Sequence, residues 1–387
     1  AKPFKAEIPE EAISELKQLL KLSKVAPVVY ENQQHDRKYG VTRDWLVQAK
    51  KHWETDFDWR EHEKYINSFP NYTVPIKDDE GYEFTIHFAA LFSEKEDAIP
   101  IAFYHGWPGS FLEFLPMMDH IRKTYSPKDL PYHIIVPSLP GYTYSSGPPT
   151  DRNYTIDDAP IIMNKLMCEI GFESGYLAQG GDLGSSVARF SAVRFDACKG
   201  FHLNMMQAQP PPNSRELPMT DLEAKFFPRG KKFSDFGSAY AREHGTRTAT
   251  IGFALSSSPL ALLAWIGEKF LEWTDEDPPL DKILESVTLY WLTDTFPRCI
   301  YPYRSFFGGE RDPSLSKIGN PQFQNDKPMG FSWFPYELGP IPKSWIEKSG
   351  NLVSFAQHES GGHFAAMEKP EVLFKDVEEF VKVAWKK

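Results

Sequence analysis

The sequence predicts an α/β protein in which a mostly parallel sheet carries helices on both faces. Short apolar segments of strand length alternate with segments of helical character, and several of them end in loops rich in glycine and proline. Short buried strands that alternate with helices are typical of such a sheet. The predicted strands cover residues 99–104, 133–136, 176–179, 199–206, 329–334 and 352–355, and a final helix begins near residue 370.

The first part of the chain has a different pattern. Apolar residues at helical spacing over 13–20 predict a helix that begins near Pro9, and the tryptophans of 45–59 indicate a second helical stretch. Apolar and polar residues then alternate over 82–88, directly after the turn residues 78–81. A period of two next to a turn predicts a β-hairpin.

A helical segment interrupts the α/β pattern. The sequence Gln-Pro-Pro-Pro at 209–212 breaks the chain, and roughly a hundred residues of helical character without a strand signal follow. The simplest interpretation is one α/β domain with a helical lid inserted into it. We therefore predict four segments: an N-terminal helical meander with the first strands (1–95), the first part of the core (96–207), the lid (208–320) and the second part of the core (321–387).

Composition and charge exclude several classes of protein. An aromatic content of 14% and a hydrophobic content of 41% favour a packed globular protein over a disordered one. The net charge of −10 opposes binding to a phosphate backbone, and the densest basic stretch, residues 229–232, is too short to form a basic stripe. We therefore expect no nucleic-acid partner.

Cysteines and apolar runs indicate the compartment. Cys168, Cys198 and Cys299 cannot all pair and form no C-x-x-C arrangement, so we expect neither a disulfide framework nor a zinc site. The N-terminal residues do not have the pattern of a secretory signal, and the best apolar run, 259–267, is too short to span a bilayer. These features predict a soluble, cytoplasmic protein, and an anchor ahead of the first residue stays an open alternative.

The most specific local feature is the sequence Gly-Gly-Asp-Leu-Gly at 180–184, between a predicted strand and a predicted helix. It has the G-x-nucleophile-x-G form of a nucleophile elbow, in which the glycines let strand and helix approach while the central side chain points outward. Two other interpretations are open. Asp182 could cap the helix. A dinucleotide-binding loop is weaker, because G-x-G-x-x-G is absent and a carboxylate would repel a pyrophosphate.

The other groups that a covalent hydrolase needs stand in suitable places along the chain. The sequence His-Gly-Trp-Pro at 105–108 follows an earlier strand, where an oxyanion amide is expected, although His-Gly after a strand is often only a tight turn. His363 stands between the last strand and the last helix, which is the place of the base. Glu337 follows the preceding strand, as an orienting acid should, and Glu347 and Asp326 are nearby rivals on loops.

An aspartate nucleophile restricts the substrate. A carboxylate is ionised at neutral pH and displaces a leaving group from saturated carbon without an activating base. The product is an ester, whose carbonyl can be attacked by water that His363 activates. A serine would instead leave an ether that the enzyme could not hydrolyse. Asp182 therefore indicates an alkyl electrophile, either an epoxide or an alkyl halide, and argues against an ester substrate.

The chain resembles the microsomal-type epoxide hydrolases, particularly the soluble fungal ones, over nearly its whole length. Residues 53–60 resemble the N-terminal meander of that family. Four further motifs fall in the family's order: HGWPGSFLEF at 105–114, PSLPGY at 137–142, GGDLGS at 180–185 and GGHFAAME at 361–368. The resemblance implies an α/β-hydrolase fold with a helical lid, a homodimer, and chemistry without a metal or organic cofactor.

The resemblance also implies two lid tyrosines that hold and protonate the epoxide oxygen, at Tyr240 and Tyr303, with Tyr301 as a nearby rival. Opening an epoxide expels an alkoxide, a very poor leaving group, so acid assistance is worth about 10²–10⁴-fold. A halide needs only weak N–H donors, so two tyrosines favour an epoxide. The chain departs from the family at Leu183, where Trp is common, and at Thr248, where Pro is common. These departures concern the shape of the pocket and of the lid.

We predict an epoxide hydrolase that converts a small epoxide and water to a vicinal diol through a covalent ester. The predicted roles are the nucleophile Asp182, the base His363, the orienting acid Glu337, the ring-opening acids Tyr240 and Tyr303, and the oxyanion amides of Trp107 and Leu183. A haloalkane dehalogenase and an epoxide-opening cyclase, in which a substrate hydroxyl replaces water, are the alternatives. A ligand receptor without turnover is disfavoured, because a receptor does not need a complete catalytic set.

Overall fold

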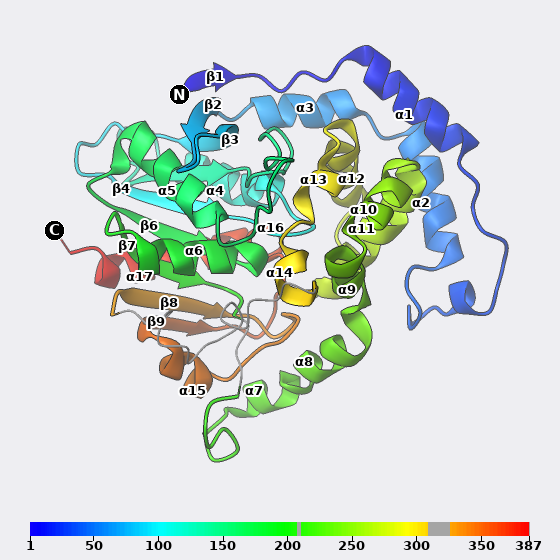
Figure 1. The fold of residues 1–387 in the computed structure, drawn as a ribbon. Helices are drawn as coiled ribbons and strands as arrows, with labels where there is room; N and C mark the ends of the chain where they lie inside the picture. The colour runs from blue at the N-terminus through cyan, green and yellow to red at the C-terminus, as the bar shows by residue number, and fades with distance from the viewer. Residues whose placement is uncertain (207–209, 309–325, 387) are drawn as a thin grey trace.

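The computed structural model of the protein describes residues 1–206, 210–308 and 326–386. Within these residues the centre is a nine-stranded sheet of order β1-β2-β3-β5-β4-β6-β7-β8-β9 (Figure 1). β1, β2 and β3 pair antiparallel, β3 pairs antiparallel with β5, and all other pairs are parallel. The strands are β1 (Lys2–Phe4), β2 (Asn71–Lys77), β3 (Glu83–Leu91), β4 (Ile99–Tyr104), β5 (Tyr132–Pro137), β6 (Tyr176–Gly180), β7 (Cys198–Leu203), β8 (Pro328–Trp333) and β9 (Asn351–Gln357).

Helices cover both faces of this sheet, as predicted. α6 packs on β4, β6 and β7, with α5 beside it, whereas α17 packs on β7, β8 and β9, with α4 and α16 beside it. His202 of β7 contacts Phe380 of α17, so its neighbours along the strand face the opposite side. These helices are α4 (Leu115–Thr124), α5 (Ala159–Met167), α6 (Asp182–Arg194), α16 (Ala365–Glu368) and α17 (Pro370–Ala384), and the shorter elements are η2 (Phe111–Phe114), η3 (Cys168–Phe172), α15 (Lys343–Ile346) and η6 (Glu347–Ser349).

The N-terminal meander consists of α1 (Glu10–Leu22), η1 (Glu31–Gln33), α2 (Arg43–Thr55) and α3 (Trp59–Asn67). The second predicted helical stretch is therefore two helices. The Asp58 side chain accepts a hydrogen bond from the backbone N–H of Arg60 and starts a new helix there. α1 contacts α11 and α12, and α3 contacts α12, so the meander wraps around the lid helices (Figure 1).

Between residues 210 and 308 the secondary structure that is described is entirely helical, in agreement with a helical lid. They are α7 (Asp221–Phe226), α8 (Pro228–Lys232), η4 (Phe233–Gly237), α9 (Ala239–Thr246), α10 (Thr248–Ser256), α11 (Pro259–Trp273), α12 (Leu280–Leu292), α13 (Thr295–Cys299) and α14 (Tyr303–Phe307). α9 packs against α14. The predicted segment boundaries at 207/208 and 320/321 and the start of the 209–212 break lie outside the described residues, so the four-segment division stays a prediction.

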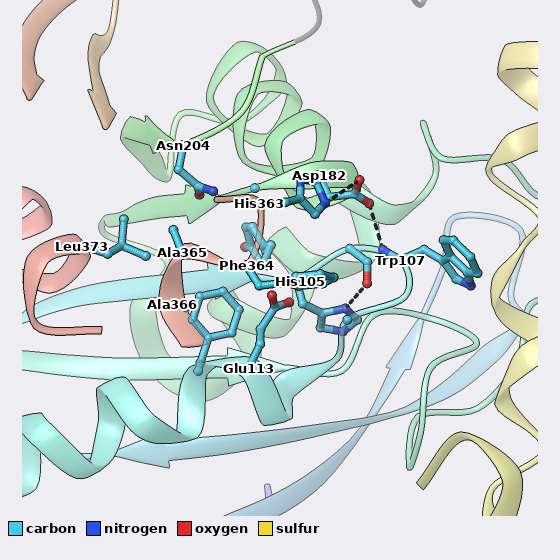
Figure 2. Close-up of a pocket in the computed structure, with 15 residues that line it drawn as sticks. His105, Trp107, Glu113, Asp182, Asn204, His363, Phe364, Ala365, Ala366 and Leu373 are labelled. Atoms are coloured by element: carbon cyan, nitrogen blue, oxygen red, sulfur yellow. Dashed lines mark hydrogen bonds and ion pairs between the residues drawn. The ribbon is translucent and has the colours of Figure 1, made fainter. Parts of the chain in front are cut away.

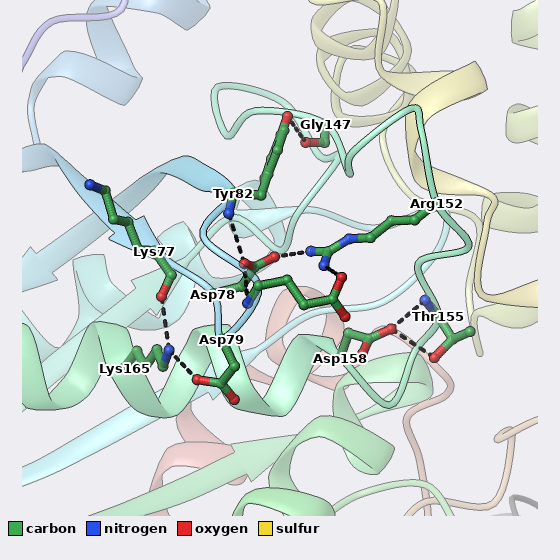
Figure 3. A network of polar contacts seen from close by, with 10 residues as sticks. Lys77, Asp78, Asp79, Tyr82, Gly147, Arg152, Thr155, Asp158 and Lys165 are labelled. Carbon is green, nitrogen blue, oxygen red and sulfur yellow. Dashed lines mark hydrogen bonds and ion pairs between the residues drawn. The ribbon is translucent and has the colours of Figure 1, made fainter.

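The predicted hairpin is β2 and β3, and its turn is tied to the loop before α5 (Figure 3). Arg152 forms ion pairs with Asp78 and Glu80 of the turn. Lys165 of α5 lies 2.6 Å from Asp79 and donates a hydrogen bond to the Lys77 carbonyl at 2.9 Å. These charge-assisted contacts hold the antiparallel edge of the sheet on the α/β core.

Three predicted absences can be compared with the described residues. The three cysteines form no disulfide, and Cys168 is only half-buried, whereas Cys198 and Cys299 are buried. Within residues 1–206, 210–308 and 326–386, no group of three His, Cys, Asp or Glu side chains is arranged to hold a metal ion. In the same ranges no single helix is long and apolar enough to cross a membrane, although the bent pair α10 and α11 meets that test of length and composition jointly.

Candidate active site

Asp182 occupies the turn between β6 and α6 in a strained backbone conformation. It is the first residue of α6 and has a left-handed φ of 46°, which is uncommon for a residue other than glycine. Its side chain does not cap the helix. Instead, Oδ1 accepts a hydrogen bond from the backbone N–H of Trp107 at 2.8 Å. The interpretation as a helix cap is therefore wrong, and the backbone has the geometry of a nucleophile elbow.

Glycines around Asp182 stand where backbones and the carboxylate come close. A Cβ at Gly180 would lie 2.1 Å from the carbonyl oxygen of Gly184, and a Cβ at Gly184 would lie 2.0 Å from that of Tyr104. A Cβ at Gly106 would lie 2.2 Å from Oδ1 of Asp182. These distances leave no room for a side chain, which is the physical reason for glycine in the motifs at 180–184 and 105–108.

We expect Gly184→Ala to destabilise the fold, because its Cβ would meet main-chain atoms that cannot move aside. Overpacking of this kind costs about 1–3 kcal/mol. The free energy of unfolding in urea measures the effect. Gly230→Ala is the matched control, since its Cβ would find the nearest heavy atom at 3.4 Å. Equal stability of the two variants would contradict the close-approach explanation.

His363 and Glu337 form a chain of side chains with Asp182. Nε2 of His363 lies 3.3 Å from Oδ2 of Asp182, and Nδ1 lies 2.7 Å from Oε1 of Glu337. Figure 2 shows His363 next to the Asp182 carboxylate, opposite the Trp107 amide. His363 follows β9, Glu337 follows β8 and Asp182 follows β6. The carboxyl ends of these strands share one edge of the sheet. This common edge brings residues distant in sequence together.

Glu337 is held in place by its own loop. Its Oε1 also accepts a hydrogen bond from the backbone N–H of Leu338 at 2.6 Å, and the side chain is buried. The sequence rivals lie elsewhere: Glu347 is 3.5 Å from Lys343, and Asp326 is exposed. Of the three acids, Glu337 is therefore the one that meets His363.

Tyr240 of α9 and Tyr303 of α14 are buried around the Trp107 indole. The Tyr240 ring stacks on the indole with centroids 5.0 Å apart, and the Tyr303 ring lies edge-on to it at 5.9 Å. The pKa of Tyr240 is raised by burial first and then by the charge of Asp182. The pKa of Tyr303 is raised by burial, by Tyr240 and by Asp182. Tyr301 packs instead on a different tyrosine. The structure thus brings the two predicted phenols, rather than Tyr301, to the Asp182 region.

A pocket opens beside Asp182 and His363 (Figure 2). Trp107, Glu113, Asn204 and Phe364 contribute to its lining, and neither Tyr240 nor Tyr303 does. The residues that line the pocket therefore lie outside the lid helices α9 and α14 that carry the two tyrosines.

Comparison with known proteins places the chain in a family. Residues 1–114 match the family described as "Epoxide hydrolase N terminus", and residues 99–262 match that described as "alpha/beta hydrolase fold". A relative from Dothistroma septosporum is 49% identical over all of this chain and 90% of its own length. The solved structure of the Aspergillus niger epoxide hydrolase has a TM-score of 0.93 and 48% identity, covering 99% of this chain and 96% of that one. Epoxide hydrolase 1 of Sus scrofa is 30% identical over 98% of this chain and 88% of its own.

The chain belongs to the microsomal-type epoxide hydrolase family. The predictions of the family, of the α/β-hydrolase fold and of the enzyme class are confirmed.

The two departures from the family pattern have a structural setting in this epoxide hydrolase. Leu183 is the second residue of α6, and its side chain is buried. Thr248 begins α10 directly after Arg247, whose φ of −135° and ψ of 40° are not helical. The Thr248 hydroxyl donates a hydrogen bond to the carbonyl of His244. The break between α9 and α10 is therefore present without a proline.

Electrostatics favour a protonated His363 in the epoxide hydrolase. Burial disfavours the imidazolium, but Glu337 and Asp182 on either side of the ring together raise the pKa of His363 well above its ordinary value. Part of this support comes from Asp182, whose negative charge the predicted chemistry would neutralise. The charge state of His363 is thus tied to that of Asp182.

Two acids of the epoxide hydrolase were missed by sequence reasoning. Glu368 accepts hydrogen bonds from the backbone N–H groups of Phe364 and Asp275, at 3.0 and 2.8 Å, and so ties the His363 loop to the lid. Burial raises the pKa of Glu368 to about 7. Glu113 lines the pocket, and burial raises its pKa to about 8. The sequence signal for Glu113 was that it is a lone acid among the apolar residues Phe111, Leu112 and Phe114.

Proposed function

We propose that this epoxide hydrolase opens its substrate by attack of Asp182 on an epoxide carbon. Oδ2 is the attacking atom, because Oδ1 is already bound to the Trp107 amide. The carbon–oxygen bond of the ring breaks, Tyr240 and Tyr303 hydrogen-bond the departing oxygen, and one of them gives it a proton and becomes a tyrosinate. The observation that carries this proposal is the Asp182 carboxylate held between the Trp107 amide and His363, with two buried phenols around the same indole.

Water then hydrolyses the ester. His363 takes a proton from water, whose oxygen attacks Cγ of Asp182. The Trp107 and Leu183 amides stabilise the oxyanion that develops on Oδ1. The bond between Cγ and the alkyl oxygen breaks, His363 returns the proton to that oxygen, and a vicinal diol leaves. The other hydrogen of the water, left on the Asp182 carboxyl, passes to His363 and restores the starting charges. One water oxygen thus ends in Asp182, and the proposed steps use only these groups and water.

The charge of Asp182 controls when His363 can act as a base. While Asp182 is charged, it supports the imidazolium. Esterification removes this negative charge and the hydrogen bond, so the pKa of His363 falls. The ring then loses a proton, which passes through solvent to the tyrosinate, and becomes available as a base. Glu337 accepts a hydrogen bond from Nδ1 of His363 and orients the ring. The nucleophile therefore switches its own base on when it reacts.

Substrate panels separate this function from its alternatives. Incubation with small chiral epoxides should give diols, whereas release of halide from simple alkyl halides without diol formation would favour a dehalogenase. A cyclic ether from a hydroxy-epoxide would indicate a cyclase. Thermal stabilisation by an epoxide without turnover would indicate a receptor. The homodimer that the resemblance implies stays a prediction.

We expect Tyr240→Phe and Tyr303→Phe each to slow ring opening by about 10–10²-fold, because each removes one donor to the developing alkoxide. The rate of ester formation, measured in a single turnover, reports this step directly. Tyr301→Phe is the matched control, since it removes a hydroxyl that is equally buried but packed elsewhere. An unchanged rate in the Tyr240 and Tyr303 double variant would refute the acid role.

A further inference from the structure

Glu113 is a buried acid next to the reacting groups that the proposed mechanism does not use. It lies in η2, at the end of the loop after β4, and lines the same pocket as Asp182 and His363. Figure 2 shows its carboxyl pointing up from this turn into the pocket. A Cβ at Gly109 would lie 2.5 Å from its Oε1, so the loop has glycine where it passes this carboxyl.

The pocket is suited to water. It is small, with room for at least one water molecule, and polar groups make up much of its lining. Asp182 and His363 both line it, whereas the two tyrosines do not. A molecule held there would lie beside both the carbon to be attacked and the base.

A water attacking Cγ of Asp182 needs two hydrogen-bond acceptors. One hydrogen goes to Nε2 of His363, and the second must be bound elsewhere so that a lone pair faces the carbon. Several oxygens of the pocket already accept a hydrogen bond. They are the carbonyl of Gly106 from His105 at 3.2 Å, the carbonyl of Gly109 from Tyr290 at 2.7 Å and Oδ1 of Asn204 from Gln179 at 2.8 Å. The Glu113 carboxyl also accepts a hydrogen bond, from the Gly106 backbone N–H, but its two oxygens give it further acceptor sites, so it is the side-chain acceptor that the pocket adds to these.

We infer that Glu113 holds the water that hydrolyses the Asp182 ester, and that it is a positioning residue for the second step. This inference rests on the proposed function. The groups that face Glu113 from other elements are Asp182, His363 and Tyr290. Because its pKa lies at about 8, the carboxyl is mostly neutral at pH 7 and offers its carbonyl oxygen to water.

Two substitutions of matched length test the inference. Glu113→Gln keeps a carbonyl acceptor and resembles the neutral acid, whereas Glu113→Met removes the acceptor. In a single turnover with an epoxide, ester formation in Glu113→Met should stay within about threefold of the unsubstituted enzyme. Ester hydrolysis should slow by roughly 10²-fold, because the water is no longer held in line. Glu113→Gln should restore hydrolysis to within about tenfold.

Intact-protein mass spectrometry follows the ester, which should accumulate only in Glu113→Met. Hydrolysis at the unsubstituted rate in Glu113→Met would overturn the inference and leave the proposed function standing. Equal slowing of both steps, or no restoration by glutamine, would also overturn it, because either result indicates a structural role. If the unsubstituted enzyme forms no ester on Asp182, the proposed function itself fails.

Discussion

Asp182→Ala is expected to lower the turnover of epoxides by roughly 10⁴–10⁶-fold, as the loss of a covalent nucleophile does in other enzymes. The side chain lies at the elbow, with Oδ1 on the Trp107 amide and Oδ2 facing His363. The carboxylate of Glu337 contacts the far side of the imidazole, at Nδ1, and not Asp182. Steady-state diol formation measures the effect, with exposed Asp129→Ala as the control.

An isotope experiment tests the same claim without a substitution. One turnover in ¹⁸O-labelled water should place the label in the Asp182 side chain, since water attacks Cγ and not the substrate carbon. The diol should carry the unlabelled oxygen that Asp182 supplied. Label found directly in the diol of the first turnover, with Asp182 unlabelled, would overturn the ester mechanism.

His363→Ala is expected to separate the two steps. Ester formation needs no base, because the carboxylate is already ionised, so the alkyl-enzyme should still form. Its hydrolysis should slow by about 10³–10⁴-fold, because the substitution removes the base that contacts Asp182. The ester should therefore accumulate as an added mass on the protein equal to that of the epoxide.

The control for this prediction is His120→Ala, which removes a histidine that lies 3.4 Å from Glu371 on the surface of α4 and α17. It should neither slow turnover nor trap an ester. If His363→Ala failed to form the ester at all, His363 would be required for attack. If it turned over normally, the assignment of the base would be wrong.

The sequence predicted the core strands because short apolar segments with loops of glycine and proline have few other solutions. Its errors were local. The stretch 45–59 split into two helices because the Asp58 side chain competes for the backbone N–H of Arg60, which periodicity does not register. The fourth strand, predicted to reach residue 206, ends at Leu203, where Asn204 turns to bond Gln179.

Motif chemistry predicted Asp182 as the nucleophile, because a carboxylate between close-packed glycines after a strand has a narrow range of uses. The same reasoning reached His363 and Glu337 through chain order alone. It reached Tyr240 and Tyr303 only through resemblance to a family, since helical periodicity treats all lid tyrosines as apolar. Only the packing of α9 against α14 distinguishes these two from Tyr301.

The sequence by itself determined the order of the α/β elements, the family and the presence of Asp182 in the elbow motif, because these follow from local patterns of polarity and from contiguous motifs. The tertiary structure decided which acid meets His363, which phenols surround Trp107, and that Glu113 faces the reacting groups. The physical reason is that such contacts join residues from different strand ends and lid helices. Their distances depend on how those elements pack, which no contiguous stretch of sequence encodes.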